Sequence, residues 1–278
     1  MTFLFHPNSY ISNGKRLTGF PRYTEVIERN LKKFLFVNLL TITGFLPFGA
    51  GVILAILSSS VLVLIPSCII GGIIAGPALS CMYDAILRGL RDVSGNWWDN
   101  YKHAWKQNWK QGILPGILFC LILGFYIFMA MLFWWSAYFP SWGTLALYLS
   151  GLLLFHMFFS VFWPQIALFK QPFRQCARNS VLFMIRFFPK TAGIAFLQML
   201  YWILISLLLP VSVFLLPLLG FWFILYTAVF LIYNTLNDCF QIEEKIGTAF
   251  PEQIPFYEDD EAWLKRKQEE TNADNANS

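Results

Sequence analysis

The sequence predicts an all-α, polytopic membrane protein with six transmembrane helices in three antiparallel hairpins, accompanied by interfacial amphipathic helices. Three observations support this fold class: a shortage of charge, six long apolar runs, and basic residues confined to alternate ends of those runs. Of the 278 residues, 57% are hydrophobic and 13% are charged, whereas globular proteins contain about 25% charged residues. A soluble chain of this length would need more charge to cover its surface.

Six segments have the length of a membrane span, because about 20 apolar residues in a helix cross roughly 30 Å of hydrocarbon. They are approximately 34–57, 61–87, 113–139, 142–169, 191–209 and 211–236. Short turn signals separate the members of each pair: three serines at 58–60, the sequence PSWG at 140–143, and Pro210. These turns predict three antiparallel hairpins.

Lysine and arginine residues orient the spans. All sixteen in residues 1–241 fall into three clusters, and the tight turns contain none. By the positive-inside rule the clusters lie in the cytoplasm, so we expect a multi-pass protein of the cell (inner or plasma) membrane with cytoplasmic N- and C-termini. The clusters are Lys15, Arg16, Arg22, Arg29, Lys32 and Lys33; Arg88, Arg91, Lys102, Lys106 and Lys110; and Lys170, Arg174, Arg178, Arg186 and Lys190.

The chain divides into a cytoplasmic N-terminal segment (1–33), a six-span membrane domain (34–240) and a cytoplasmic acidic tail (241–278). Residues 242–278 contain ten acidic and four basic residues, and we expect a helix around 259–270 and disorder after about 271. Basic pairs at i, i+4 precede each hairpin. Two explanations are open: a topological requirement of every outward span, or a threefold hairpin repeat. The pairs are Arg29/Lys33, Lys106/Lys110 and Arg186/Lys190.

Residues 95–112, GNWWDNYKHAWKQNWKQG, predict an amphipathic helix with an aromatic stripe flanked by lysines. Tryptophan and tyrosine prefer the headgroup level, and lysines beside them contact anionic lipid. The segment is therefore interpreted as an in-plane interfacial helix or as a partner-docking surface. A sugar or quaternary-ammonium cage is a further interpretation. The candidate residues are Trp97, Trp98, Tyr101, Lys102, Trp105, Lys106, Trp109 and Lys110.

Nucleic acid is not expected as a partner. The aromatic and cationic parts of a single-strand binding surface are present, but the neighbouring spans hold the rings at the membrane. The expected partners are the lipid bilayer with anionic headgroups on its cytoplasmic side, and either a membrane transporter or a second copy of the chain.

Small and polar residues within the spans predict packing contacts. Gly72, Gly76 and Ser80 form a small-xxx-small face that lets two helices approach closely. Asp84 and Arg88 are spaced for an i, i+4 salt bridge at the membrane interface, which we prefer to a proton-handling site.

A polar site near the middle of the membrane is a separate candidate. His156 is the one ionisable side chain well inside a span, with Gln165 and Gln198 as the amides of the candidate site. Asn38, Gln165 and Gln198 could join His156 through interhelical hydrogen bonds. Signatures of nucleotide-binding, hydrolase or metalloprotease sites do not occur. The three histidines are far apart, and the five cysteines are scattered without CxxC spacing. We therefore expect no metal, no cofactor and reduced thiols.

The sequences GPALSCMYDAILRGLRD and WWDNYKHAWKQNWKQG together resemble the YesL family of bacterial membrane proteins. The resemblance rests on a span end with Gly, Pro and Ala, a tyrosine, an Arg-Gly pair, and an aromatic-basic stretch ending in Lys-Gln. It implies a bacterial inner-membrane protein associated with carbohydrate-uptake systems, and it supplies no catalytic residues. The matching residues are Gly76, Pro77, Ala78, Tyr83, Arg88, Gly89, Trp105, Lys110 and Gln111.

Three functional hypotheses follow. The first is a non-enzymatic accessory or assembly partner of a carbohydrate transport system, which docks through the aromatic-basic helix and the tail. The second is a small-solute transporter or channel with a midplane site near His156. The third is a membrane enzyme acting on lipid through Asp84 or Asp99.

Overall fold

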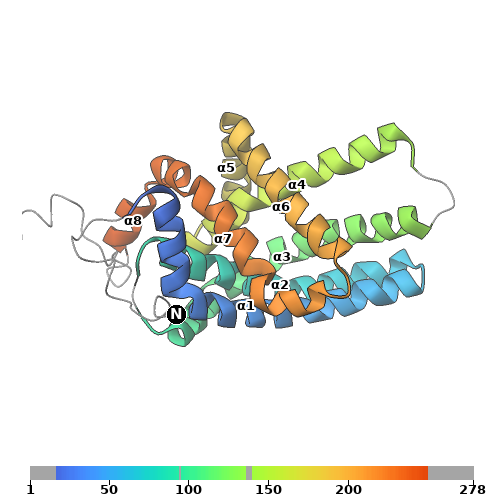
Figure 1. The fold of residues 1–278 in the computed structure, drawn as a ribbon, viewed down its shortest axis with the longest axis horizontal. Helices are drawn as coiled ribbons and strands as arrows, with labels where there is room; N and C mark the ends of the chain where they lie inside the picture. The colour runs from blue at the N-terminus through green and yellow to red at the C-terminus, as the bar shows by residue number, and fades with distance from the viewer. Residues whose placement is uncertain (1–16, 94, 136–139, 250–278) are drawn as a thin grey trace, which may run out of the picture.

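The computed structural model describes residues 17–93, 95–135 and 140–249. Within these residues the chain forms eight helices and no strand (Figure 1). Six of the helices are long and apolar enough to cross a membrane, which confirms the all-α polytopic fold. They are α1 (Gly19–Leu57), α2 (Val61–Leu90), α3 (Trp97–Trp135), α4 (Trp142–Leu168), α6 (Phe188–Leu207) and α7 (Ser212–Phe240).

The six spanning helices run alternately up and down the bundle. The links from α1 to α2 and from α6 to α7 lie on the right in Figure 1, as do the end of α3 and the start of α4. Both ends of the described chain lie on the left, where the short helix α8 (Ile242–Ala249) follows α7. We call this left side, where α1 and α3 begin and α2 and α7 end, the basic end. The predicted helix at 259–270 and the predicted disorder after 271 lie outside the described residues.

Two helices extend further toward the basic end than their apolar runs predict. The expected N-terminal segment was 1–33. Helix α1 begins at Gly19, so residues 19–33 of that segment are helical and continuous with the first span. Helix α3 is also unbroken over 39 residues, so residues 97–112 form its first turns and are not a separate helix. In both cases the extension carries residues that pack against α2, and this packing stabilises turns that would otherwise project into solvent.

A separate amphipathic helix does occur in the third basic cluster. Helix α5 (Phe173–Arg186) connects α4 to α6 and buries Cys176, Ser180 and Phe183. Its Arg174 and Arg178 are exposed. Its exposed side also includes the apolar residues Val181, Leu182 and Ile185. The helix therefore presents basic and apolar groups together, which is typical of a helix at a membrane surface.

Helices α2 and α3 approach each other closely through paired glycines. A Cβ atom on Gly76 would lie 2.2 Å from the Gly112 carbonyl oxygen, and one on Gly116 would lie 2.4 Å from the Gly72 carbonyl oxygen. Each helix therefore contributes a GxxxG face to the same crossing. The contact through Gly72 and Gly76 could be predicted from the sequence. The GxxxG of Gly112 and Gly116 was not predicted, because lysines and tryptophans dominate the turns before it.

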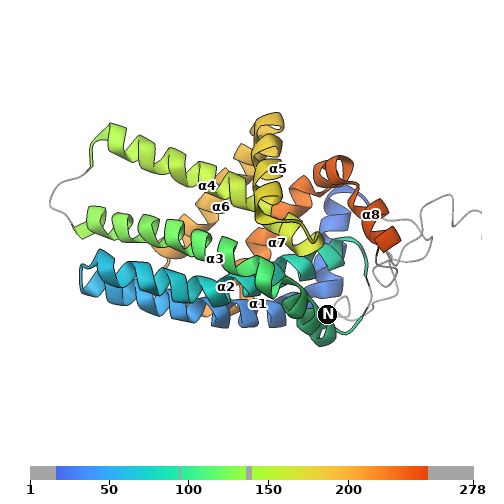
Figure 2. The ribbon, with the colours of Figure 1, turned by 180° about the vertical axis from the view of Figure 1, so that it is seen from behind.

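The three hairpins are not equivalent in packing. Helices α3 and α4 diverge toward their connecting segment (Figures 1 and 2), and they meet mainly through aromatic rings such as Phe119, which lies 5.1 Å from Phe155. Helices α1 and α2, in contrast, are so close that a Cβ atom on Gly71 would lie 2.6 Å from the Phe48 Cα atom. The structure thus offers no packing argument for a threefold repeat.

Helix α7 is interrupted in its apolar part. Gly220 has non-helical dihedral angles, and Pro217 precedes it. The fully buried Asn38 of α1 bridges this break: its Nδ2 donates to the carbonyl oxygens of Leu216 (2.9 Å) and Pro217 (3.1 Å). Its Oδ1 accepts from the backbone N–H of Phe221 at 2.9 Å. One amide side chain therefore pairs backbone groups that an interrupted helix would leave unpaired in hydrocarbon.

Candidate functional site

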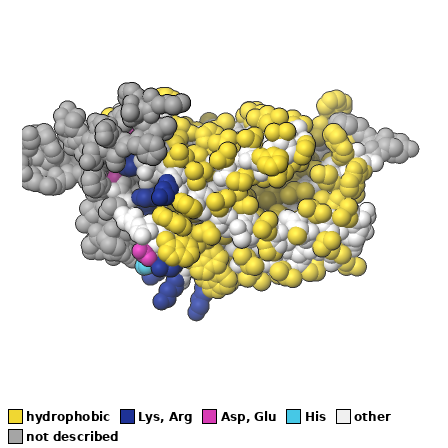
Figure 3. All heavy atoms as spheres, turned by 60° about the horizontal axis from the view of Figure 1, so that its bottom comes forward, with side chains coloured by type: hydrophobic (Ala, Val, Ile, Leu, Met, Phe, Trp, Pro, Cys, Tyr) yellow, Lys and Arg dark blue, Asp and Glu magenta, His cyan; other side chains and the backbone are white. Residues whose placement is uncertain are grey.

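The basic end is the polar part of the molecule. Figure 3 shows Lys and Arg side chains gathered at the left of the view, next to residues that are not described, while hydrophobic side chains cover most of the rest of that face. Three features occur at this end: a buried ring of ion pairs, a row of aromatic rings with exposed lysines, and a small pocket between α1, α2 and α3.

The ring of ion pairs joins the start of α1 to the end of α2. The guanidinium group of Arg22 contacts both Glu25 and Asp92, and that of Arg29 contacts the same two carboxylates. Arg22 Nη2 lies 2.6 Å from Asp92 Oδ2, and Arg29 Nη1 lies 2.6 Å from Glu25 Oε1. The side chain of Asp92 is completely buried. Because two cations and two anions alternate in a closed ring, each buried charge has an opposite neighbour.

The same ring caps the C-terminus of α2. The N–H of Val93 donates to the Arg88 carbonyl oxygen and the N–H of Asp92 donates to that of Gly89, which is a Schellman arrangement. Asp92 occupies the position with positive φ (63°) that usually belongs to glycine. An aspartate there is explained by its carboxylate, which the two arginines share. Arg29 Nη2 also donates to the Gly89 carbonyl oxygen at 3.2 Å, so a cation lies at the negative end of the helix dipole.

A second ion pair lies further along α2. Arg88 Nε donates to Asp84 Oδ2 at 2.7 Å, and both side chains are largely buried, which confirms the salt bridge predicted from their spacing. Just beyond α2, Arg91 is buried and its Nε donates to the Leu87 carbonyl oxygen. Burial lowers the pKa of the Arg91 guanidinium, and nearby Tyr233 and Asp84 oppose that shift.

The aromatic residues of 97–112 form a continuous row of ring contacts. The rings of Trp98 and Tyr101 are parallel within 4°, and those of Trp105 and Trp109 lie 5.2 Å apart. A stacked contact 4.9 Å long links the row to Phe36 of α1. The rings in order are Phe36, Trp97, Trp98, Tyr101, Trp105 and Trp109.

These rings do not lie on the buried face of α3, although an aromatic stripe on an amphipathic helix would ordinarily be its buried face. The buried positions are Ala104, Asn108 and Gly112, which follow one another at four-residue intervals. The aromatic residues flank this face and are partly exposed, and the lysines at 102, 106 and 110 are exposed beyond them. Small residues are buried here because α2 is too close to admit a ring. Lys102 pairs with Asp99 at 2.9 Å, and its ammonium lies 5.8 Å from the Trp98 ring.

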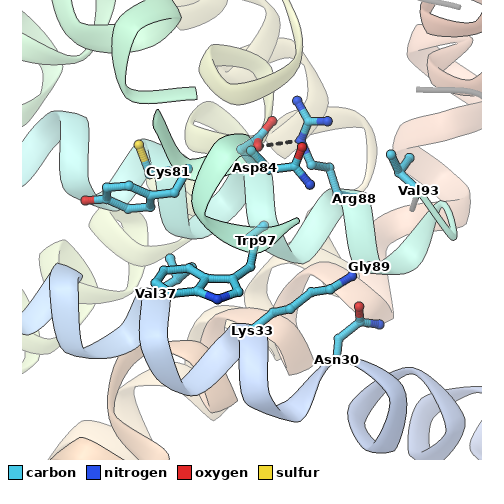
Figure 4. A pocket seen from close by; sticks show the side chains of 12 residues that line it. Asn30, Lys33, Val37, Cys81, Asp84, Arg88, Gly89, Val93 and Trp97 are labelled. Atoms are coloured by element: carbon cyan, nitrogen blue, oxygen red, sulfur yellow. Dashed lines mark hydrogen bonds and ion pairs between the residues drawn. The ribbon is translucent and has the colours of Figure 1, made fainter. Parts of the chain in front are cut away.

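The pocket lies where the three features meet. Figure 4 shows side chains from α1, α2 and the start of α3 around it, with the Lys33 side chain extended between Trp97 and Asn30. Its polar lining comprises Asn30, Lys33, Asp84, Arg88 and Asn100, and Trp97 forms an apolar wall.

The three side chains proposed for a midplane site are engaged separately. Gln198 of α6 accepts a hydrogen bond from Ser160 at 2.8 Å, and Gln165 donates to Ser180 of α5 at 2.9 Å. The His156 ring nitrogen Nδ1 lies 3.0 Å from the Leu152 carbonyl oxygen of its own helix. The two glutamines are buried. The structure thus places Gln165 and Gln198 in two different helix–helix contacts.

Ser80 lies on the buried face of α2 that Gly72 and Gly76 begin. Its hydroxyl is one of the buried groups without a hydrogen-bond partner in the structure, and both polar atoms of Asn108 are others. The glycine contacts place these two residues one turn beyond the Gly76–Gly112 crossing on their respective helices. The Ser80 hydroxyl and the Asn108 amide are therefore buried in the α2–α3 contact, next to its closest crossing.

Sequence reasoning missed Glu25, Asp92, Asn30, Lys33 and Asn100 as site residues. A signal for the first pair existed: Arg22, Glu25 and Arg29 recur at i, i+3 and i+7, which places them on one helical face. Nothing local marks Asp92, because its arginine partners lie on α1. Asn100 is likewise unmarked, because only the fold brings it beside α1 and α2 in the pocket.

Among residues 17–93, 95–135 and 140–249, no group of three or more His, Cys, Asp or Glu side chains is placed to hold a metal ion. The cysteines are free; four are buried and Cys239 is exposed.

The fold and the basic end define the chain as a multi-pass helical membrane protein with one polar, aromatic-rich end. A family model described as "Protein of unknown function, DUF624" matches residues 33–130. The match covers most of α1, all of α2 and most of α3, including the aromatic row and the glycine crossing. No curated protein and no solved structure matches the chain.

Proposed function

We propose that the protein is a YesL-like, non-enzymatic accessory or assembly partner of a carbohydrate transport system in the bacterial inner membrane. The family match over residues 33–130 supports the YesL-like assignment, because the matched residues include the segment that resembles the YesL family. In this proposal the basic end faces the cytoplasm and the first turns of α3 are the docking surface.

One observation carries the proposal. The outer flank of α3 presents a row of partly exposed aromatic rings beside three exposed lysines, and its opposite flank is held against α2. Tryptophan and tyrosine dominate the energetics of protein interfaces, and a row of lysines steers an acidic partner toward them. The occupant is therefore an acidic cytoplasmic surface of a membrane transport subunit.

The geometry favours this proposal over a transporter with a site near His156. A transport site needs polar groups that are available to a solute. Gln165, Gln198 and the Asn38 amide instead hydrogen-bond neighbouring helices. These contacts have the character of interhelical packing contacts in membrane proteins.

Replacing Lys102, Lys106 and Lys110 together with glutamine is expected to abolish recovery of the transport partner. The change removes the charges that attract the partner but leaves the rings and the α2 contact intact. The measurement is affinity purification from native membranes in mild detergent, with quantitative mass spectrometry of transport permease subunits. Unmodified protein should recover one such subunit in a near-stoichiometric amount.

The matched control replaces the exposed bases Lys170, Arg174 and Arg178 with glutamine, which changes the net charge equally at another connection. The control variant should retain the partner. Equal loss in both variants would show only a general electrostatic attraction, and purification without any stoichiometric transport subunit would count against the proposal.

A further inference from the structure

The pocket of Figure 4 lies at the basic end, beside the part of α1 where exposed apolar residues begin. The Phe36 ring, 40% exposed, stacks on Trp97, which forms the apolar wall of the pocket. From Phe36 an exposed apolar face continues along α1 at helical spacing through Leu39, Leu46, Ile53 and Leu57. A molecule with one polar group and long apolar chains would therefore find both kinds of surface side by side.

The pocket contains several hydrogen-bond donors within a mostly apolar lining. The ammonium group of Lys33 and the side-chain amide of Asn100 line it, and no described residue forms a hydrogen bond or ion pair with either group. Arg88 also lines it; only its Nε is occupied, by Asp84. With Lys33 and Arg88 positive and Asp84 the one carboxylate in the lining, the net charge is +1. Such a lining matches an anionic group with several acceptor oxygens.

Lys33 differs from its neighbour in where it points. Lys32 is exposed, whereas Lys33 is partly buried and lines the pocket. A lysine on the outer face meets anionic headgroups in general. A lysine inside a pocket selects one bound group, so the two residues separate general attraction from specific binding.

We propose that this pocket binds the phosphate of an anionic membrane phospholipid, with its acyl chains along the apolar face of α1 that begins at Phe36. Lys33 and Asn100 donate to the phosphate oxygens, and the Phe36–Trp97 stack covers the glycerol region. The lysines proposed to dock the transport partner do not line the pocket, but Trp97 and Tyr101 of the aromatic row do. Lipid and partner would therefore lie side by side at the start of α3, and the binding test below uses lipid alone.

The test measures binding of phosphatidylglycerol to the delipidated full chain in detergent, by native mass spectrometry and by the lipid-induced rise in unfolding temperature. Lys33→Gln and Asn100→Asp are each expected to weaken binding about tenfold, because each removes a charge-assisted hydrogen bond or adds a like charge. The second variant should fold, since an acidic residue is favourable in the first turn of a helix.

Two matched controls should bind as the unmodified protein does. Lys32→Gln removes the same charge one residue away, and Asn96→Asp adds the same charge at the helix cap, where the side chain already accepts from the Trp98 N–H. Phosphatidylcholine and free glycerol phosphate should produce no comparable rise in unfolding temperature.

Several outcomes would overturn the proposal. Unchanged binding by Lys33→Gln and Asn100→Asp would show that the lipid does not bind in the pocket. Equal weakening by Lys32→Gln would show that lipid binding is only a general electrostatic attraction. An equal effect of phosphatidylcholine would remove the preference for an anionic lipid. An equal effect of glycerol phosphate would identify a soluble phosphate as the ligand instead of a lipid.

Discussion

Replacing Asn38 with leucine is expected to lower the free energy of unfolding by about 4 kcal/mol, because several backbone groups of α7 lose their partner inside the membrane. Asn38 pairs the Leu216 and Pro217 carbonyl oxygens and the Phe221 N–H. Leucine has a similar volume, so the loss would come from hydrogen bonding and not from a cavity. The measurement is reversible unfolding in mixed micelles, monitored by circular dichroism.

The control is Thr43→Leu on the same helix. Thr43 is exposed and bonds only to the Leu39 carbonyl oxygen of its own helix, so its replacement should change stability little. An Asn38→Leu variant as stable as the Thr43→Leu variant would contradict the bridging role of the amide. Asn38→Asp should also be destabilising, because it loses the donor and adds a buried charge.

Replacing Asp92 with asparagine is expected to destabilise the protein by about 3 kcal/mol or more, because Arg22 and Arg29 lose a shared buried counter-charge. Asparagine tolerates the positive φ of this position almost as well as aspartate does, so the backbone of the α2 cap is preserved. The effect should be measured by the same unfolding assay.

Asp92→Gly distinguishes charge from backbone strain at this cap. Glycine is better suited to positive φ, but it too removes the carboxylate, so this variant should also be clearly less stable than the unmodified protein. Asp99→Asn is the control, since that residue forms an exposed pair with Lys102 and exposed pairs contribute little. A stable Asp92→Gly variant would show that the ring of ion pairs adds nothing to the fold.

The class of fold could be predicted from the sequence because its determinants are local. Apolar length, turn residues and the clustering of Lys and Arg identify six spans without reference to tertiary contacts. The ends of the spans were harder to predict. Helices α1 and α3 continue past their apolar runs because Arg22, Glu25 and Arg29 in the first, and Ala104, Asn108 and Gly112 in the second, pack against α2.

The site was only partly predictable for a related reason. The aromatic-basic segment is conspicuous in the sequence, and the structure shows its rings in contact. The Asp92 carboxylate and the Asn38 amide are single polar residues whose partners lie about 70 and 180 positions away. Such pairings depend on how helices meet, which spacing within one helix does not reveal.

The proposed function requires the basic end to face the cytoplasm, and cysteine accessibility tests this orientation most directly. Cys239, the one exposed cysteine of the chain, marks the basic end. Gly143→Cys would mark the opposite end, where a Cβ atom would contact only the Ser141 hydroxyl oxygen, at 3.9 Å. In intact cells, a membrane-impermeant maleimide should label Gly143→Cys in a Cys239→Ser background and leave the unmodified protein unlabelled until the membrane is permeabilised. Labelling of Cys239 in intact cells, with Gly143→Cys protected, would contradict the account.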